Sequence, residues 1–487
     1  MKKINIGLLG LGQIGTGLYE ILAAKKALFA RQLGVSFELA KIAEKYPERN
    51  KKVHPPKSIM TRDAFAVVRD PSIDVVVELI GGTTVARQLI MEALRNGKHV
   101  VTANKALLAE HGDEIFELAH RMKRWLCFEA SVGGGIPCIK ALREGLAANR
   151  IDSVHAIING TTNYILTQMT AKGTSFAEAL AGAQKQGFAE ANPFLDVSGH
   201  DAAHKLAILA RVAFGGKVRF RDIYCEGITD ISSDDIAFAK EFGYTIKLLA
   251  IAKRSGPGME ARVQPTLLPN SHILANVNGS FNAVLMRGDE VGDVLFYGRG
   301  AGPHPTASAV IADLADIAKA GAAGPAEDRF MARVLGKTIP VRSIFSILSR
   351  YYLRFYVIDR PSVLAGISKI LGKYKISISD VMQRERSAGR VVPLILLTHD
   401  THEKNLRAAV REIDGMSCIK GKPNSPSENS KVNWTSPGNH QKEENRCQGK
   451  PNSPSENSKV NWTSPGNHQK EENRCQGKTQ VIRIEEA

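Results

Sequence analysis

Seven polar or ionisable side chains lie within sixteen residues of the stretch "GFAEANPFLDVSGHDAAHKLAIL", which spans 187–209: Glu190, Asn192, Asp196, His200, Asp201, His204 and Lys205. Asp201 and Lys205 are four residues apart, so both project from one face of a helix. On a protein surface such a pair contributes only about 0.3–0.5 kcal/mol. Apolar residues follow directly, however, so the helix is expected to enter the core. A buried Asp–Lys pair is costly, and we therefore expect it to take part in chemistry.

His200 and His204 have the same four-residue spacing, which is also the spacing of two zinc ligands on a helix. A zinc protease motif would place a glutamate directly after the first histidine, and no third ligand is apparent here. We therefore interpret these histidines as neighbours of the site and not as metal ligands.

A glycine motif opens the chain. Gly10, Gly12 and Gly15 follow the apolar run "INIGLLGLG" and precede a helical pattern. In the GxGxxG motif these glycines make the tight turn, admit a pyrophosphate and allow close helix packing. We predict nucleotide binding here, since a simple strand–helix turn needs fewer glycines.

Two further features concern the ligand. A carboxylate at the end of the second strand favours NAD, whereas a basic residue favours NADP; Glu44 ends this strand, but Lys45, Arg49 and two more lysines follow it. Both cofactors remain open. Lys105 follows the strand "KHVVTAN" and is expected at the carboxyl edge of a parallel sheet, where ligands bind; its position alone equally fits an exposed loop lysine.

Strand and helix patterns divide the chain. Residues 1–128 alternate between them, which predicts an α/β Rossmann-type nucleotide-binding domain. Residues 129–325 have a looser pattern, expected to form an α+β catalytic and dimerisation domain. Residues 326–345 are predicted to be a linker. Residues 346–487 have a βαββα pattern, completed by "TQVIRIEEA" at the end of the chain to a ferredoxin-like βαββαβ fold.

That last domain is interrupted by a repeat. A 28-residue segment at 423–450 recurs unchanged at 451–478 and is rich in Asn, Ser and Pro. It has too few aliphatic residues to offset the entropy cost of ordering. We predict a disordered insertion at 423–478, since two copies without apolar periodicity do not indicate a solenoid.

Composition excludes several classes of protein. No run approaches the roughly 18 apolar residues of a membrane helix, and the six cysteines form no CxxC pair. We expect a cytoplasmic protein with reduced thiols. The formal charge of +16 is scattered, so it favours attraction of small anions over nucleic-acid binding.

The long stretch at 187–205 resembles the signature of homoserine dehydrogenases. The resemblance extends to the N-terminal glycine motif, "TANK", "EASVGGGIP" at 129–137, "INGTTNYIL" at 158–166 and "GRGAG" at 298–302. Residues after about 346 resemble the ACT regulatory domain that many of these enzymes carry.

This resemblance implies NAD(P)H-dependent, reversible reduction of L-aspartate 4-semialdehyde to L-homoserine, on the route to threonine, methionine and isoleucine. It implies that Lys205 is the proton donor, that Lys105 and Asp201 assist, and that Glu190, Gly187 and Asp201 bind the substrate. Cofactor contacts are implied at Gly10, Gly12, Gln13, Ile14, Gly15, Lys105 and Gly302. A monovalent cation such as sodium is implied at Glu129, Val132, Gly134 and Ile136, mostly through backbone carbonyls. A homo-oligomer and threonine binding at the ACT domain are implied as well.

Two positions depart from the family pattern. Asn192 stands where an aspartate is usual, and Ser362 stands where ACT domains commonly have glycine. Two alternatives to a homoserine dehydrogenase are open to such a sequence. A different Rossmann dehydrogenase would not need the long signature. A catalytically inactive amino-acid sensor would not need Lys105, Glu190, Asp201 and Lys205 together.

Overall fold

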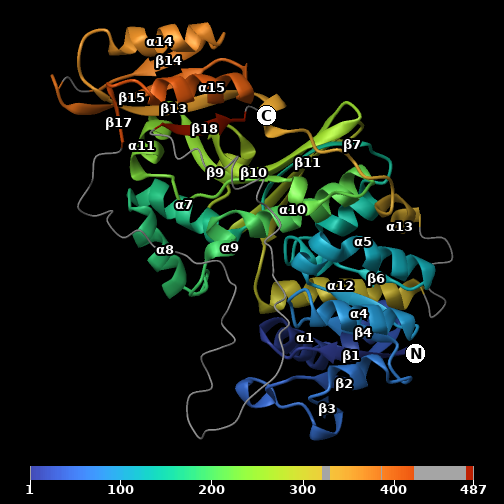
Figure 1. Ribbon diagram of the computed structural model, residues 1–487. Helices are drawn as coiled ribbons and strands as arrows, with labels where there is room; N and C mark the ends of the chain where they lie inside the picture. The colour runs from blue at the N-terminus through green and yellow to red at the C-terminus, as the bar shows by residue number, and fades with distance from the viewer. Residues whose placement is uncertain (1, 321–328, 385–386, 422–478, 486–487) are drawn as a thin grey trace, which may run out of the picture. The chain divides into compact units, whose positions relative to one another are not determined.

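The computed structural model describes residues 2–320, 329–384, 387–421 and 479–485. The chain divides into two compact units (Figure 1). The first comprises residues 1–350 together with 482–487, and the second comprises 351–481. The 28-residue repeats, and with them the predicted disorder of 423–478, lie outside the described residues.

A six-stranded parallel sheet forms the first layer of the N-terminal part. Its strands run in the order β3-β2-β1-β4-β5-β6, which is the 3-2-1-4-5-6 order of the dinucleotide-binding fold. The predicted Rossmann sheet is thus confirmed. The strands are β1 (Lys2–Leu9), β2 (Val35–Ala43), β3 (Met60–Thr61), β4 (Val75–Glu78), β5 (His99–Thr102) and β6 (Leu126–Cys127).

Helices connect these strands. The helical pattern after the glycine motif is interrupted at Lys25, and Gly34 ends the second helix in the left-handed conformation that glycine adopts most readily. The connecting helices are α1 (Gln13–Ala24), α2 (Lys26–Leu33), α3 (Ala64–Val68), α4 (Val85–Arg95) and α5 (Lys105–Arg121).

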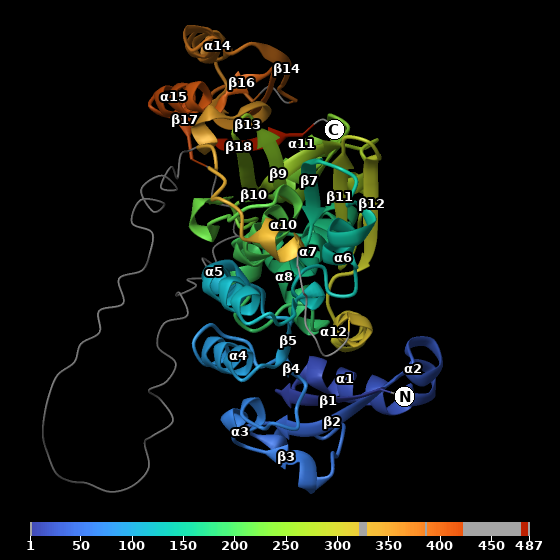
Figure 2. The same cartoon turned by 90° about the vertical axis from the view of Figure 1, so that its right-hand side faces the viewer.

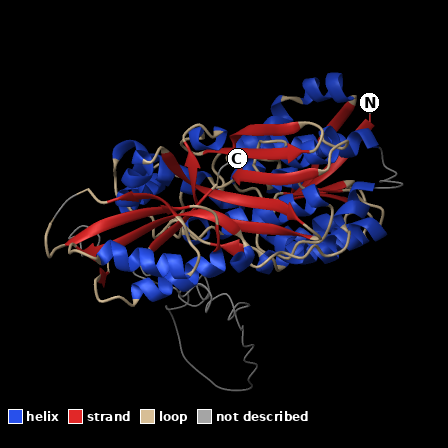
Figure 3. Cartoon of the chain, turned by 90° about the horizontal axis from the view of Figure 1, so that it is seen from above, coloured by secondary structure: helices blue, strands red, loops and turns tan. Residues whose placement is uncertain are grey.

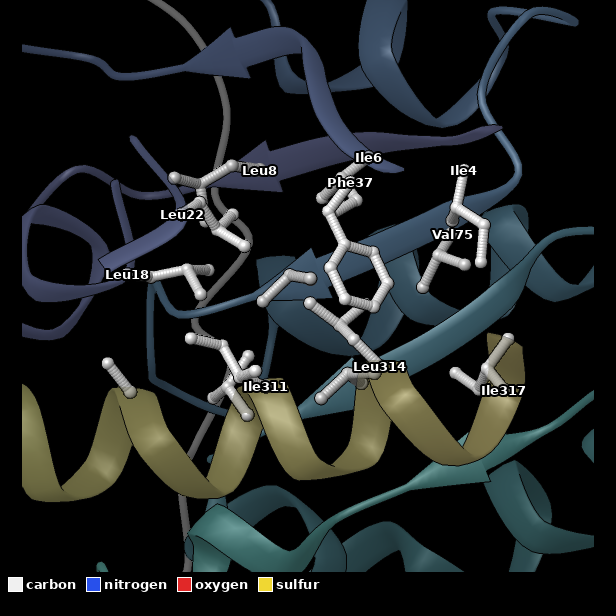
Figure 4. Close-up of a cluster of buried hydrophobic side chains, with 14 of the residues drawn as sticks. Ile4, Ile6, Leu8, Leu18, Leu22, Phe37, Val75, Ile311, Leu314 and Ile317 are labelled. Atoms are coloured by element: carbon white, nitrogen blue, oxygen red, sulfur yellow. The ribbon is translucent and has the colours of Figure 1, made fainter. Parts of the chain in front are cut away.

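One helix reaches this sheet from far along the sequence. Helix α12 (Pro303–Ala320) was expected in the catalytic domain, yet it packs on α1 and on the apolar face of the sheet. Figure 4 shows Ile311, Leu314 and Ile317 of α12 facing residues of β1 and β2. A side chain at Gly17 would lie 2.9 Å from the Pro303 carbonyl oxygen, so glycine permits this close approach.

A mixed sheet forms the core of the catalytic part, in the order β12-β11-β7-β9-β10-β18, with β8 on β10. Helices α7, α10 and α11 pack on these strands (Figure 2), and Figure 3 distinguishes the long strands from the helices by colour. The strands are β7 (Ile151–Ile157), β8 (Tyr224–Cys225), β9 (Tyr244–Ser255), β10 (Gly258–Pro269), β11 (Phe281–Gly288), β12 (Gly292–Arg299) and β18 (Gln480–Ile484). The helices are α6 (Cys138–Lys140), α7 (Gly160–Lys172), α8 (Phe176–Lys185), α9 (Phe194–Val197), α10 (His200–Phe214) and α11 (Ser233–Glu241).

The strand β18 was expected to complete the ACT-like fold. Its first residues, Gln480 and Val481, belong to the second unit, where β18 is the neighbour of β13 and Val481 packs against the apolar core. Residues 482–485 are grouped with the catalytic unit. Arg483 and Ile484 pair in parallel with β10. The buried Glu485 carboxylate contacts Lys253 and Arg262. Buried charges of opposite sign explain this placement, because either partner alone would be costly to bury.

The expected linker is partly structured. Within it, α13 (Arg329–Val334) forms, and the Arg211 guanidinium donates a hydrogen bond to the Val334 carbonyl at 3.0 Å. Main-chain bridges join Lys217 to Thr338 and Met259 to Val341. The segment 329–341 therefore packs on the catalytic unit because its backbone finds partners there.

The second unit has the predicted βαββα order. Strand β13 pairs antiparallel with β15, which in turn pairs with β14. The elements are β13 (Leu348–Ile358), α14 (Val363–Lys373), β14 (Ile378–Met382), β15 (Val391–Thr398), β16 (Thr401–His402), α15 (Glu403–Asp414) and β17 (Ile419–Lys420). Throughout the described ranges of both units, no helix combines the length and apolarity needed to cross a bilayer.

Candidate active site

Helix α10 carries the central ion pair. Gly199 precedes it in the left-handed conformation, with φ of 85°, and so turns the chain into the helix at a position that favours glycine. Asp201 is 7% exposed. Its Oδ2 atom accepts a hydrogen bond from Lys205 Nζ at 2.6 Å. The predicted pairing along one helical turn is therefore present in a buried setting.

A second lysine reaches the same carboxylate. Lys105 is the first residue of α5, at the carboxyl edge of β5, and its Nζ atom lies 3.1 Å from Asp201 Oδ1. Burial acts to raise the pKa of Asp201, but the Lys205 and Lys105 ammonium groups outweigh it and hold this pKa well below its usual range. The attraction of Asp201 in turn raises the pKa of Lys105. The two lysines thus contact different oxygens of one carboxylate, Lys205 at Oδ2 and Lys105 at Oδ1.

Asn159 and Ile158 complete the site, and the sequence analysis did not single them out. Asn159 Nδ2 donates to Asp201 Oδ2 at 2.8 Å and to Asp196 Oδ1 at 2.7 Å. The Ile158 carbonyl accepts from Lys205 Nζ at 2.6 Å. In the sequence, only the motif "INGTTNYIL" indicates that these two residues belong to the site. Asn159 also caps α7, because its side chain accepts the Thr162 N–H.

Asp196 is a second carboxyl beside this pair. Burial raises its pKa, and the nearby Asp201 charge raises it further. The Asn159 amide lies between the two carboxyls and donates to both. A cationic group of a ligand would therefore be attracted to this side of the site.

The remaining residues of the 187–209 stretch shape the approach to α10. Gly187 ends α8 with φ of 73° and is exposed. Glu190 is exposed as well, and its charge contributes to the raised pKa of Lys105. Asn192, which had no assigned role, accepts a hydrogen bond from the Phe194 N–H at 3.2 Å and so starts the turn into α9.

The two histidines contact other groups. His200 Nδ1 lies 2.8 Å from Ser198 Oγ, and the His204 ring stacks on Phe220 with centroids 4.2 Å apart. His204 Nε2 is also 3.3 Å from Glu110 Oε1. In the part of the chain that the structure describes, no three His, Cys, Asp or Glu side chains are grouped to hold a metal.

The glycine motif lies at the start of α1. A side chain at Gly15 would lie 2.2 Å from the Gly10 carbonyl, whereas one at Gly12 would meet nothing within 4 Å. Gln13 and Ile14 begin the helix after Gly12, so their N–H groups are available to an anion. Gly302 directly precedes α12, the helix packed against this motif.

Beside the motif is a cavity of about 590 Å³, and basic residues line its outer part. Glu44 also lines this cavity. Its carboxylate accepts the N–H groups of Leu11 at 2.7 Å and Tyr46 at 3.1 Å. The Arg49 guanidinium lies over the Tyr46 ring, 4.3 Å from its centroid. The lining also includes Asn50, Lys51 and Lys52.

The predicted cation residues form a buried turn. Glu129 lies in a short 3-10 turn, and its carboxylate accepts the N–H groups of Ile139 at 2.9 Å and Lys140 at 2.6 Å. Burial raises the Glu129 pKa to about 7. Gly133 and Gly134 follow with positive φ. The carboxylate is thus used to cap α6, and main-chain carbonyls are the oxygens that remain for a cation.

A doubly wound parallel sheet with this glycine turn, next to a buried cluster of two lysines on one carboxylate, defines an NAD(P)-dependent oxidoreductase. The family model "Homoserine dehydrogenase, NAD binding domain" matches residues 10–129, and "Homoserine dehydrogenase" matches 137–315. The chain belongs to the homoserine dehydrogenase family.

Relatives support this assignment over most of the chain. The homoserine dehydrogenase of Pseudomonas aeruginosa is 46% identical over 427 residues, covering 86% of this chain and 98% of that protein. The crystal structure of a homoserine dehydrogenase from Thiobacillus denitrificans has a TM-score of 0.82 and 45% identity, covering 86% of this chain and 97% of that one. A hyperthermophilic archaeal homoserine dehydrogenase mutant in complex with NADPH has a TM-score of 0.55 and 27% identity, covering 64% and 96%.

Proposed function

We propose that the chain interconverts L-aspartate 4-semialdehyde and L-homoserine, with Lys205 as the group that gives and takes the proton. The single observation that carries this assignment is the placement of the Lys205 ammonium between Asp201 Oδ2 and the Ile158 carbonyl. An ammonium has three N–H donors, and these two contacts leave one for a substrate oxygen.

The remaining groups align the substrate. The bound nicotinamide cofactor would supply or accept the hydride. As hydride reaches the aldehyde carbon, negative charge develops on its oxygen, and a donor fixed beforehand stabilises that charge without reorganisation. Lys105, 40% exposed at its side chain, adds positive charge next to Lys205. Glu190 and Asp201 would attract the substrate ammonium, with Asp201 also holding both lysines.

NADP is the cofactor that we propose. Each oxygen of the Glu44 carboxylate already accepts one backbone N–H group, so this carboxylate is less available to a ribose 2′-hydroxyl than a free one. Arg49, Lys51 and Lys52 line the same cavity, and basic residues at this point favour a 2′-phosphate. Steady-state kinetics with both cofactors should give a higher kcat/KM with NADPH, and an Arg49→Ala variant should lose affinity for NADPH but not for NADH. Equal effects on both would contradict this assignment.

A monovalent cation at Glu129, Val132, Gly134 and Ile136 is also proposed. Val132 and Gly134 are buried, and the Val132 carbonyl accepts only the weak thiol donor of Cys138, at 3.4 Å. Oxygens with spare lone pairs suit a hard cation. Replacing sodium with choline in the buffer should lower the thermal unfolding temperature, whereas an unchanged temperature would argue against bound sodium.

The second unit is proposed to be an ACT-type regulatory domain that binds an amino acid such as threonine. Its βαββα order supports this proposal. Isothermal titration with threonine tests it directly, and binding without any NADPH turnover would instead support the sensor alternative.

A homo-oligomer is proposed because β12 lies at the outer edge of the mixed sheet and exposes Tyr297 by 54%. Light scattering would measure the oligomeric state.

A cytoplasmic location accords with the thiols of Cys138, Cys225 and Cys418, which form no disulfide.

The central experiment follows NADPH oxidation with aspartate semialdehyde. The unmodified chain should consume NADPH. Lys205→Met should lower kcat by roughly 100-fold to 10,000-fold, the range of general acid–base catalysis, with an unchanged unfolding temperature. Lys185→Met, at the exposed end of α8, is the matched control. Wild-type turnover by Lys205→Met would refute the proton-transfer assignment.

A further inference from the structure

Glu78 is a buried carboxyl group that the proposed reaction does not use. It is the last residue of β4, at the edge of the parallel sheet where ligands bind, and it is 0% exposed. Its Oε1 atom accepts the N–H groups of Ile80 at 2.9 Å and Gly81 at 3.0 Å, and its Oε2 atom accepts the Thr102 hydroxyl at 2.6 Å. Burying a carboxyl is costly, so this group is expected to have a specific task.

The first turn that Glu78 holds faces open space. Gly81 and Gly82 follow β4 with φ of 72° and 75°, and a side chain at either position would meet nothing within 4 Å. Ile80 is 41% exposed. The two backbone bonds to Glu78 therefore fix a glycine turn that borders the crevice at the carboxyl edge of the sheet.

The second turn follows β5 and is tied to the first. Thr102, the last residue of β5, accepts the Asn104 N–H at 3.0 Å through the same hydroxyl that donates to Glu78. Asn104 Nδ2 then donates to the Gly82 carbonyl at 2.7 Å. The two turns are thus joined twice, once through Glu78 and Thr102 and once through Asn104.

This network ends at the lysine of the active site. The Asn104 Oδ1 atom accepts the Leu107 N–H at 3.1 Å and caps α5, whose first residue is Lys105. Lys105 Nζ lies 3.1 Å from Asp201 Oδ1. A shift of the cap would therefore move Lys105 relative to Asp201.

We propose that Glu78 is a positioning residue that, through Thr102 and Asn104, fixes both the glycine turn 80–82 against the bound cofactor and the start of α5 that carries Lys105. The part that concerns Lys105 rests on the function proposed above. The part that concerns the turn does not, because cofactor binding can be measured without turnover.

The sharpest test replaces the central hydroxyl. Thr102→Val keeps the shape of the side chain but leaves Glu78 Oε2 and the Asn104 N–H without their partner. We expect the dissociation constant for NADPH to rise and kcat to fall, each by roughly tenfold to a hundredfold, the usual cost of an unpaired buried polar group. Thr102→Ser retains the hydroxyl and should restore both values. Glu78→Gln retains an acceptor for Ile80 and Gly81 and should be intermediate.

A purely structural role predicts another pattern. Val101→Ala removes packing from the same strand without touching the network, since Val101 is fully buried among apolar residues. At a temperature well below unfolding it should bind NADPH and turn over like the unmodified chain. If Thr102→Val has a lower unfolding temperature but an unchanged NADPH dissociation constant and unchanged KM values, the proposal is wrong. Absence of turnover in the unmodified chain would instead refute the proposed function and leave the NADPH-binding comparison intact.

Discussion

Lys205 Nζ and Asp201 Oδ2 lie 2.6 Å apart, one turn from each other on α10, with the carboxylate 7% exposed. The same carboxylate also contacts Lys105. One anion therefore separates two cations, and removing its charge would leave the two ammonium groups repelling each other within a buried site.

Asp201→Asn should therefore lower kcat by roughly 100-fold or more, because the proton donor loses the carboxylate that orients it. Folding should persist, since the amide can still accept one hydrogen bond. Stopped-flow measurement of NADPH oxidation would determine kcat. Asp113→Asn removes the charge that pairs with Arg211 of α10 at 2.6 Å and is a matched control that should retain turnover. Equal losses in both variants would contradict a specific role of Asp201.

We expect the buried Lys247 to make the free energy of unfolding depend on pH. It is 1% exposed, and its ammonium donates to the Val277 carbonyl and to two amide oxygens. Burial lowers its pKa from 10.5 to about 8. Between these values the folded protein binds fewer protons than the unfolded chain, so raising the pH stabilises the fold.

The measurement compares unfolding temperatures from pH 7.5 to 10. The unmodified chain should gain stability relative to Lys247→Met as the pH rises through this window, because only the unmodified chain releases the proton. Lys240→Met, an exposed lysine of α11, should follow the unmodified chain. A constant difference across the range would show that Lys247 does not titrate there.

We expect replacement of Ser362 by glycine to stabilise the second unit. It precedes α14 with φ of 72°, and its side chain makes no capping hydrogen bond. A non-glycine residue in the left-handed region costs about 1–2 kcal/mol. Ser362→Gly should therefore raise the unfolding temperature of the second unit by a few degrees, measured by calorimetry. Ser362→Ala is the control and should give no gain.

We expect the protein to tolerate deletion of one of the two 28-residue repeats. The Thr479 hydroxyl donates to Asp414 at the end of α15, and Gly421 lies only seven residues after Asp414. The chain thus leaves and returns near one helix end. For a segment without regular structure, as the sequence predicts here, halving the length changes the closure free energy by only about 0.6 kcal/mol. Deleting 451–478 should leave kcat and the unfolding temperature nearly unchanged, and a large loss of either would assign the repeat a structural role.

The sequence predicted the local parts of the site well. The glycine motif, Lys105 at a strand end and the Asp201–Lys205 pair all depend on spacing within a few residues, which the periodicity of a helix or strand determines. Asn159 was missed because its two carboxylate partners are 37 and 42 residues away. The contacts of α12 with α1 and of residues 483–484 with β10 join distant segments of the chain, and no local pattern reports which distant surface will bury an apolar face or a charge.

The placement of β18 has a consequence for synthesis. A nascent chain emerges from its N-terminus, so residues 482–485 appear only after the whole of 351–481 has been made. Until then Arg262 and Lys253 lack the Glu485 carboxylate, and Thr266 and Leu267 of β10 lack their partners on β18. An unpaired strand edge is open to association with other chains. The catalytic unit must therefore remain incomplete on the ribosome while the second unit is translated, and it closes its sheet last.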